Sequence, residues 1–259
     1  MGHRIKLTVA YLGAGFSGWQ RQARGRTVQG ELERALGRMT GVTPKVVGAG
    51  RTDAGVHAAG QTAHTDLPAK IEPADLVRAL NASLDPDLRI LSSAAVGDAF
   101  HARHHALAKL YTYRVRWRPE RLPWAGLRTI TTNSPTDEEQ ARRAVALLVG
   151  SRDMASFSVP QARPTVRTLH RAWIEDRRHG MNLHFVGDGF LRYQVRRMVG
   201  AVLDVGLGRL SLADFEDMLN RPQPGASIRT APARGLTLER VFYRHSPLMD
   251  PGAAHHPNS

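Results

Sequence analysis

The 259-residue sequence predicts an α+β protein made of two successive halves of similar design. In some stretches apolar and polar residues alternate, which is the period of a strand with one buried face. In others apolar residues recur every three or four positions, which is the period of an amphipathic helix. The two kinds of stretch follow one another as β-α-β-β-α-β, and this order occurs twice along the chain. A chain of this length with 42% hydrophobic residues can bury one large core or two smaller ones.

The first half opens with a strand in which Ile5, Leu7, Val9 and Tyr11 alternate with polar or small residues. The elements predicted after it are a helix with Val28, Leu32, Leu36 and Met39 as its apolar stripe, extended stretches over about 43–50 and 56–66, a helix carrying Leu76, Leu80 and Leu84, and an extended run at 88–90. Pro73 stands in the first turn of the second helix, where a residue without an amide proton is tolerated.

The second half opens with a strand that has one aromatic face and one basic face. The aromatic face consists of Tyr111, Tyr113, Val115 and Trp117, and the opposite face of Thr112, Arg114, Arg116 and Arg118. Thr136 and Glu139 predict a capping box before a helix, and Gly150 is placed to end that helix.

A hairpin, two helices and a final strand complete the second half. The hairpin covers about 168–177 and 181–187 and turns at Arg178-His179-Gly180. The remaining elements are a helix over about 190–205 with Leu191, Val195, Met198 and Val202 as its stripe, a helix capped by Ser211 that carries Leu212, Phe215 and Leu219, and a strand with Leu236, Leu238, Arg240 and Phe242.

Each half has the element order of a ferredoxin-like split βαβ unit. We expect an N-terminal half over 1–105, a C-terminal half over 106–246 joined to it without an evident flexible linker, and a flexible tail over 247–259. A cleft between the halves is the expected place for an active site.

The charge balance favours a polyanionic partner. Lys and Arg number 36 against 23 Asp and Glu, which gives a net charge of +13. Because each neutralised phosphate releases condensed counterions, nucleic acid is the first candidate, although a general preference for arginine also produces such an excess. The sequence has no cysteine, which excludes disulfides, thiolate nucleophiles and cysteine-based zinc sites. No signal peptide and no membrane-spanning apolar run is evident, so we expect a soluble, cytoplasmic protein.

The Gly-rich segment between the two middle strands of the first half is the main candidate for chemistry. It reads Gly48-Ala49-Gly50-Arg51-Thr52-Asp53-Ala54-Gly55-Val56-His57. It lacks the third glycine of a dinucleotide fingerprint and the Gly-Lys-Ser/Thr of a phosphate loop. Its glycines suit a tight turn that presents Asp53 to a ligand, but by composition alone an ordinary turn with a surface aspartate is favoured.

Other candidate sites are less specific. His101, His104 and His105 lack a carboxylate at ligand spacing, so no metal site is predicted and the histidines are read as solvent-exposed or RNA-facing. Aromatic and basic residues interleave from 109 to 114, which suits either stacking on bases or a core with a solvated face. Arg192 and Arg196 are expected one turn apart on a helix, as a solvated face or as a clamp for an anion.

Several segments, taken in order, resemble the tRNA pseudouridine synthase A family. They are Tyr11 with Gly18-Trp19-Gln20-Arg21-Gln22, Thr27-Val28-Gln29-Gly30-Glu31-Leu32-Glu33, Gly50-Arg51-Thr52-Asp53-Ala54-Gly55-Val56-His57-Ala58, Phe100-His101-Ala102-Arg103, Tyr111-Thr112-Tyr113, Phe190-Leu191 through Val195-Arg196 to Gly200, and Ala231-Pro232-Ala233-Arg234-Gly235-Leu236. The Arg-Thr-Asp-Ala-Gly-Val-His signature is the most specific of them, and the resemblance runs through most of the chain.

The resemblance implies the pseudouridine synthase fold, with the active-site cleft between its halves, and a role for each matching residue. Asp53 is then the nucleophile, Tyr111 stacks on the target base, Arg196 pairs with the aspartate and Arg51 holds the flipped-out base. Further RNA contacts are expected from His57, Arg103, Gln20 and Arg21. Arg192-Tyr193-Gln194 departs from the family's more usual Tyr-His-Met, and Arg197 follows directly, so both Arg196 and Arg197 stand as partners for the carboxylate.

Family members act on the anticodon stem-loop of tRNA as homodimers without a cofactor or metal, so the same is expected of this chain. Pseudouridine is an isomer of uridine, and a carboxylate can attack C1′, add at C6 or assist formation of a glycal. The alternatives are a pseudouridine synthase with another RNA target, a non-catalytic RNA-binding module, and a nucleoside hydrolase, for which no second catalytic carboxylate is evident.

Overall fold

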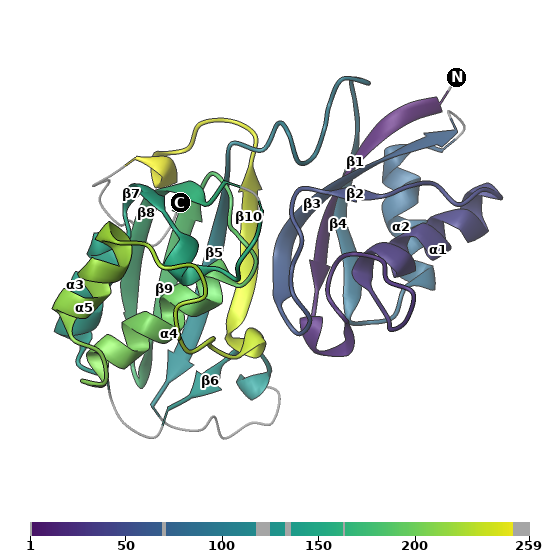
Figure 1. Cartoon of the computed structure of the whole chain (residues 1–259). Coiled ribbons are helices and arrows are strands. Elements are labelled where there is room, and N and C mark those ends of the chain that lie inside the picture. Colours follow the sequence, from purple (N-terminus) through teal and green to yellow (C-terminus); the bar gives the residue numbers. More distant parts are fainter. Residues whose placement is uncertain (1, 69–70, 118–124, 133–135, 163, 251–259) are drawn as a thin grey trace. The chain divides into compact units, whose positions relative to one another are not determined.

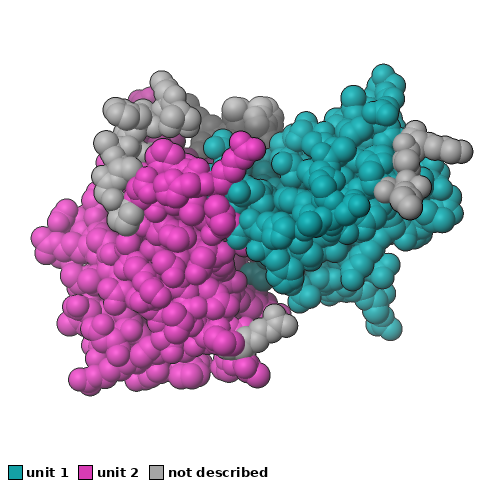
Figure 2. Space-filling model, turned by 90° about the horizontal axis from the view of Figure 1, so that it is seen from above, with its two compact units in different colours: residues 1–106, 237–243 teal, residues 107–236, 244–259 magenta. Residues whose placement is uncertain are grey.

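The computed structural model describes residues 2–68, 71–117, 125–132, 136–162 and 164–250 (Figure 1). The chain forms two compact units, which Figure 2 colours separately. Unit 1 comprises Met1–Ala106 and Thr237–Tyr243, and unit 2 comprises Leu107–Leu236 and Arg244–Ser259. The division differs from the predicted halves 1–105 and 106–246 chiefly in the final strand, which joins unit 1 because it pairs there.

Unit 1 is built on a sheet with β1 near its centre. Its strands are β1 (Gly2–Tyr11), β2 (Val47–Gly48), β3 (His57–Pro68), β4 (Leu88–Val96) and β10 (Leu236–Phe242). β1 runs antiparallel between β4 and β3, with Ile5 opposite Ala95 and Thr65. On its other side β3 pairs with β2 at His64 and with β10 at His57. The order β4-β1-β3-β2 is that of the predicted ferredoxin-like unit, although the extended stretch 43–50 contributes only a two-residue strand.

Two helices cover one side of this sheet, as Figure 1 shows. They are α1 (Val28–Thr40) and α2 (Pro73–Ser83). The predicted apolar stripes are buried except for Met39, which is half-buried near the end of α1, and Leu84 is buried just beyond the end of α2. The Thr27 hydroxyl caps α1 by accepting from the Gly30 amide, and Gly41 ends it with a φ of 76° that favours glycine. The short turn η1 (Gly13–Gly15) follows β1.

The strands of unit 2 pair in the order β5-β9-β8-β7, with β6 beside β5. Its strands are β5 (Ala108–Arg116), β6 (Ile130–Thr131), β7 (Gly150–Asp153), β8 (Val166–Arg177) and β9 (Gly180–Gly187). The predicted hairpin is confirmed, because β8 and β9 pair antiparallel from Leu169 opposite Gly187 to Arg177 opposite Gly180. The short turns η2 (Ala125–Arg128), η3 (Ala155–Phe157), η4 (Ala233–Gly235) and η5 (Pro247–Met249) belong to the same unit.

Three helices pack together on one face of the strands of unit 2 (Figure 1). They are α3 (Glu138–Leu147), α4 (Gln194–Gly206) and α5 (Leu212–Asn220). α4 begins at Gln194, later than the predicted start near 190, because Tyr193 has a left-handed φ of 63°. Arg192 therefore precedes the helix, and the expectation that it lies one helical turn from Arg196 is wrong. Together the two units confirm the predicted α+β class.

The helix ends of unit 2 correct two further expectations. Ser211 caps α5 as predicted, by accepting from the Asp214 amide. The cap of α3 is Asp137, whose carboxylate accepts from the Gln140 amide at 3.0 Å, and not Thr136 of the predicted capping box. Gly150 does not end α3 either, since the helix stops at Leu147 and Gly150 opens β7.

The beginning of the predicted tail is ordered. η5 contacts β8 and β9, whereas residues 251–259 of the predicted tail 247–259 lie outside the described residues. Within the described part of the chain, no helix combines the length and apolar character that crossing a membrane requires.

The cap assignment predicts how two neighbouring substitutions differ. Asp137→Ala removes the acceptor at the N-terminus of α3 and should lower the free energy of unfolding by about 1 kcal/mol. The matched control is Thr136→Val, because the Thr136 hydroxyl is buried without a hydrogen-bond partner among the described residues. That control should leave stability unchanged or raise it slightly. Urea unfolding measures both, and a larger loss from Thr136→Val than from Asp137→Ala would contradict the assignment.

Candidate functional site

The segment 48–57 forms a turn between β2 and β3, here called the Asp53 turn. The Val56 amide donates to the Asp53 carbonyl at 3.1 Å, and Gly55 adopts a φ of 79° that favours glycine. The Asp53 side chain is partly exposed, and Arg51 is exposed. The turn therefore presents a carboxylate and a cation two residues apart at the surface of unit 1.

Three hydrogen bonds from different elements hold the middle of this turn. The hydroxyls of Tyr11 and Thr52 share a hydrogen bond of 2.8 Å beneath the turn. The Trp19 amide donates to the Thr52 carbonyl at 3.1 Å, and the Gln61 side-chain amide donates to the Gly50 carbonyl at 2.9 Å. Burial raises the pKa of Tyr11 above its ordinary value, so this hydroxyl stays neutral.

Glycines of the turn and its neighbour allow close packing. A Cβ on Gly48 would lie 2.5 Å from the Trp19 ring, and one on Gly18 would lie 2.7 Å from the Thr52 carbonyl oxygen. Both distances are shorter than atomic contact allows, so only glycine fits. These two glycines thus allow the turn to pack closely against the chain around Trp19. The composition of the segment alone did not indicate this packing role.

His57 lies under the turn and not on the surface. It is 1% exposed, and its Nδ1 accepts from the Gly13 amide at 3.1 Å. That bond fixes η1 against the start of β3. The position suits support of η1, and the expected RNA contact of His57 stays a prediction.

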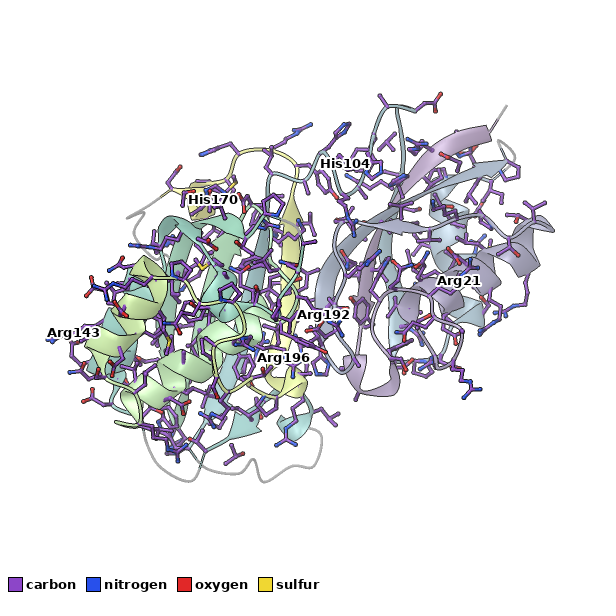
Figure 3. All side chains as sticks on the ribbon, in the orientation of Figure 1. Arg21, His104, Arg143, His170, Arg192 and Arg196 are labelled. Carbon is purple, nitrogen blue, oxygen red and sulfur yellow. The ribbon has the colours of Figure 1, made fainter. Side chains whose placement is uncertain are left out.

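Gln20 and Arg21 lie against α1. The side-chain oxygen of Gln29 accepts from the Gln20 side chain at 2.6 Å and from the Arg21 amide at 3.0 Å. The Arg21 guanidinium forms an ion pair of 3.1 Å with Glu33, whose side chain is 4% exposed. Arg21 is itself 64% exposed, and Figure 3 shows it beside α1. Its charge therefore both balances a buried carboxylate and reaches the surface.

Arg103 is exposed within the turn 101–105, whose histidines connect that turn to β3. His64 Nδ1 accepts from the Ala102 amide at 3.1 Å, and the rings of His64 and His101 lie 4.8 Å apart. Burial, reinforced by His101 and Arg4, lowers the pKa of His64 to about 4, so it is neutral at pH 7. Within the described residues no group of three or more side chains is arranged to hold a metal ion.

Tyr111 lies on β5 of unit 2, opposite Phe185 of β9. Its ring meets the ring of Phe190 edge to face, with 5.2 Å between centroids, and the residue is 6% exposed. Tyr113, two residues on, is fully buried and donates from its hydroxyl to the Pro232 carbonyl at 2.8 Å. Of the two tyrosines on this face, Tyr113 is part of the core of unit 2. Tyr111 instead packs against Phe190, in the segment that precedes α4.

The two adjacent arginines at the start of α4 differ in their surroundings. Arg196 Nε donates to the Ala231 carbonyl at 2.8 Å, and its guanidinium lies 5.1 Å from the Tyr193 ring centroid. Figure 3 shows Arg192 and Arg196 near each other in this region. Arg197 is 9% exposed, donates to the carbonyls of Ser156 and Ala226, and has its pKa lowered by burial. Arg197 therefore binds the backbone of its own unit.

The predicted site residues divide between the units. Unit 1 carries Asp53, Arg51, His57, Gln20, Arg21 and Arg103, and unit 2 carries Tyr111 and Arg196. Their meeting at one site stays a prediction. Sequence reasoning missed the support of the Asp53 turn by Tyr11, Thr52 and Gln61. Tyr11 occupies an ordinary inward position of an alternating strand, and that pattern carries no sign of its hydrogen bond.

Known proteins were compared with the chain as a whole. A family model described as tRNA pseudouridine synthase matches residues 7–105 and 144–244. The chain is 41% identical to tRNA pseudouridine synthase A of Bacillus licheniformis, over 93% of this chain and 99% of that protein. It is 40% identical to tRNA pseudouridine synthase A of Thermus thermophilus, over 93% and 96%, and 38% identical to tRNA pseudouridine synthase A 1 of Desulfotalea psychrophila, over 92% and 99%. The residues matched by the family model include the Asp53 turn and α4, and the chain belongs to the tRNA pseudouridine synthase family.

Proposed function

We propose that this protein isomerises uridine to pseudouridine in the anticodon stem-loop of tRNA, with Asp53 as the nucleophile. The observation that carries the proposal is the Asp53 turn, in which the carboxylate follows a residue whose carbonyl and hydroxyl are both held by hydrogen bonds. Such a turn holds a reacting group in one direction, and pre-organisation of this kind lowers the barrier of the chemical step.

The reaction needs a nucleophile but no redox partner. The bond from N1 to C1′ breaks, the base turns, and a bond from C5 to C1′ forms. The proton on C5 is released to solvent and N1 gains a proton, so atoms and electrons balance without an oxidant or a cofactor. Asp53 acts by attack at C1′, by addition at C6, or by assisting formation of a glycal, and all three use the same carboxylate.

Base flipping assigns roles to Arg51 and Tyr111. A uridine stacked in a stem hides its glycosidic bond, so the enzyme must extrude the nucleotide at a cost of a few kcal/mol. The exposed guanidinium of Arg51, two residues from Asp53, replaces part of the lost stacking and pairing. The Tyr111 ring stacks on the flipped base, and its position against the edge of Phe190 holds it in one orientation.

Arg196 is the proposed partner of the Asp53 carboxylate. A neighbouring cation keeps an aspartate ionised and oriented where water is excluded. The choice of Arg196 over Arg197 is supported by the contacts of Arg197, which is buried and donates to Ser156 and Ala226. The bond from Arg196 Nε to the Ala231 carbonyl ties the side chain to the backbone of its own unit, and a guanidinium can also pair with a carboxylate through two of its nitrogens.

The setting proposed for this activity is the cytoplasm, with tRNA as substrate and a homodimer as the active form. The net charge of +13 suits a polyanionic substrate. The exposed cations Arg21, Arg51 and Arg103 offer contacts to phosphates on unit 1.

Replacing the nucleophile tests the proposal. Asp53→Asn keeps the size of the side chain but removes its charge, so isomerisation should fall to background while tRNA affinity changes by less than about threefold. Release of tritium from tRNA labelled at uracil C5 measures the reaction, and filter binding measures affinity. The matched control is Asp75→Asn, which removes an exposed carboxylate of α2 that pairs with Arg78. Substantial turnover by Asp53→Asn would sink the assignment.

The two adjacent arginines should respond differently to the same substitution. Arg196→Gln should slow single-turnover isomerisation by about 100-fold, because the transition state loses a charged partner. Arg197→Gln should instead lower the free energy of unfolding by about 2 kcal/mol, because charged hydrogen bonds to buried carbonyls are lost. Rapid-quench kinetics and urea unfolding measure the two effects. A folded Arg197→Gln protein that is slow, beside an Arg196→Gln protein of normal rate, would reverse the roles.

A further inference from the structure

The chain before α1 forms a loop over residues 17–26 that lies directly against the Asp53 turn. Its ends meet, since the Ser17 amide donates to the Arg26 carbonyl at 2.7 Å. Its backbone also satisfies the first amides of α1, with the carbonyls of Gly18 and Trp19 accepting from residues 28 and 29 at 3.2 and 3.0 Å. The loop is therefore one piece with the N-terminus of α1.

This loop and the residue before it contact the Asp53 turn on both sides of the carboxylate. On one side the Trp19 amide donates to the Thr52 carbonyl at 3.1 Å. On the other side the Gly55 amide donates to the Phe16 carbonyl at 3.4 Å. Because residues 52 and 55 flank Asp53, a shift of the chain at 16–19 also shifts the backbone that carries the nucleophile.

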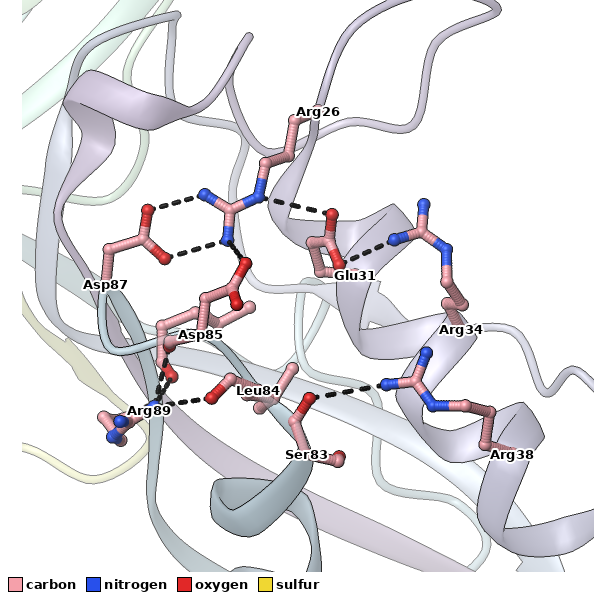
Figure 4. Close-up of polar contacts among 10 residues, drawn as sticks. Arg26, Glu31, Arg34, Arg38, Ser83, Leu84, Asp85, Asp87 and Arg89 are labelled. Carbon is pink, nitrogen blue, oxygen red and sulfur yellow. Dashed lines mark hydrogen bonds and ion pairs between the residues drawn. The ribbon is translucent and has the colours of Figure 1, made fainter.

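Arg26 holds that part of the chain in place, as Figure 4 shows. Its guanidinium donates two hydrogen bonds to Asp87, of 2.5 and 2.9 Å, and a third to Asp85 at 2.9 Å. Its Nε lies 3.3 Å from the Glu31 carboxylate. The same guanidinium lies 4.2 Å from the ring centroid of Phe16, within cation–π distance.

These contacts connect three parts of unit 1 through one side chain. Glu31 lies on α1, and Asp85 and Asp87 lie in the turn between α2 and β4, which is itself joined to the end of β1 because the Leu12 amide donates to the Asp87 carbonyl at 2.9 Å. Arg26 and Asp87 are 28% and 27% exposed, so the pair is partly shielded from solvent and stronger than an open surface ion pair. Without Arg26, three carboxylates would face one another.

We propose that Arg26 is a positioning residue for the nucleophile. By clamping Phe16 and the loop 17–26 onto Asp85 and Asp87, it sets the backbone that flanks Asp53 and hence the direction of the carboxylate. Arg26 acts through Phe16 and Trp19, and it touches neither the substrate nor Asp53. The inference has a structural half, that Arg26 positions the backbone around Asp53, and a catalytic half, that this position affects the rate of isomerisation. The catalytic half rests on the proposed function, whereas the structural half does not.

Hydrogen–deuterium exchange tests the structural half without tRNA. In Arg26→Met, peptides covering 14–21 and 50–58 should exchange at least about tenfold faster, while peptides of unit 1 outside these segments and outside the residues that contact Arg26 exchange as in the wild type. The matched control is Arg34→Met, which removes an exposed guanidinium that pairs with the same Glu31 but does not contact Phe16. Unchanged exchange at 50–58 in Arg26→Met, or equal acceleration in Arg34→Met, would overturn the proposal.

Single-turnover kinetics tests the catalytic half. Arg26→Met should isomerise uridine about 10- to 100-fold more slowly with tRNA affinity within about threefold, because a misplacement of about 1 Å is enough for such a loss. Asp87→Asn should show the same effect to a smaller degree, and the double variant should be no slower than Arg26→Met, since both residues act through one clamp. Arg34→Met should react within about twofold of the wild type.

The outcomes separate this proposal from the proposed function. If the wild type makes no pseudouridine, the proposed function fails and the exchange experiment alone decides the role of Arg26. If the wild type is active and both clamp variants match its rate, the positioning role fails by itself. If Arg26→Met does not fold, Asp87→Asn decides, and global unfolding of both variants would make the pair a fold determinant and overturn the proposal.

Discussion

The structure of the candidate site depends on how the backbone around Thr52 is held. Its carbonyl accepts from Trp19, its hydroxyl bonds to Tyr11, and the neighbouring Gly50 carbonyl accepts from Gln61. These three partners come from β1, β3 and the loop before α1, so the turn is fixed by the core of unit 1 and not by its own short-range bonds alone. The backbone that carries the Asp53 carboxylate is therefore held in place before a substrate binds.

The remaining features of unit 1 follow from that constraint. Gly18 and Gly48 are required because the turn and the Trp19 ring approach each other too closely for a side chain. His57 is buried because the start of β3 must hold η1, through the Gly13 amide, beneath the same turn. In unit 2, Arg197 donates to the backbone carbonyls of Ser156 and Ala226, and Arg196 donates from Nε to the Ala231 carbonyl.

The periodic elements could be predicted from the sequence, because strands with one buried face and amphipathic helices carry their period in the residues themselves. The start of α4 could not, since a left-handed tyrosine at 193 overrides the apolar stripe that begins earlier. Asp137 took the cap of α3 that Thr136 was expected to provide, because neighbouring residues of both types suit a cap and only the backbone decides. In the site, Asp53 stood out only through its ordered resemblance to a family. One of its supports joins Tyr11 and Thr52, which lie 41 positions apart, and no local pattern records such a contact.

The central claim is that the chain isomerises uridine to pseudouridine and forms no other product. Nucleoside analysis of an unmodified tRNA transcript, incubated with the wild-type protein and no added cofactor, tests it most directly. The account predicts that the uridine lost equals the pseudouridine gained, that all of it lies in the anticodon stem-loop, and that no free uracil appears. Release of uracil, or recovery of the uridine unchanged, would contradict it.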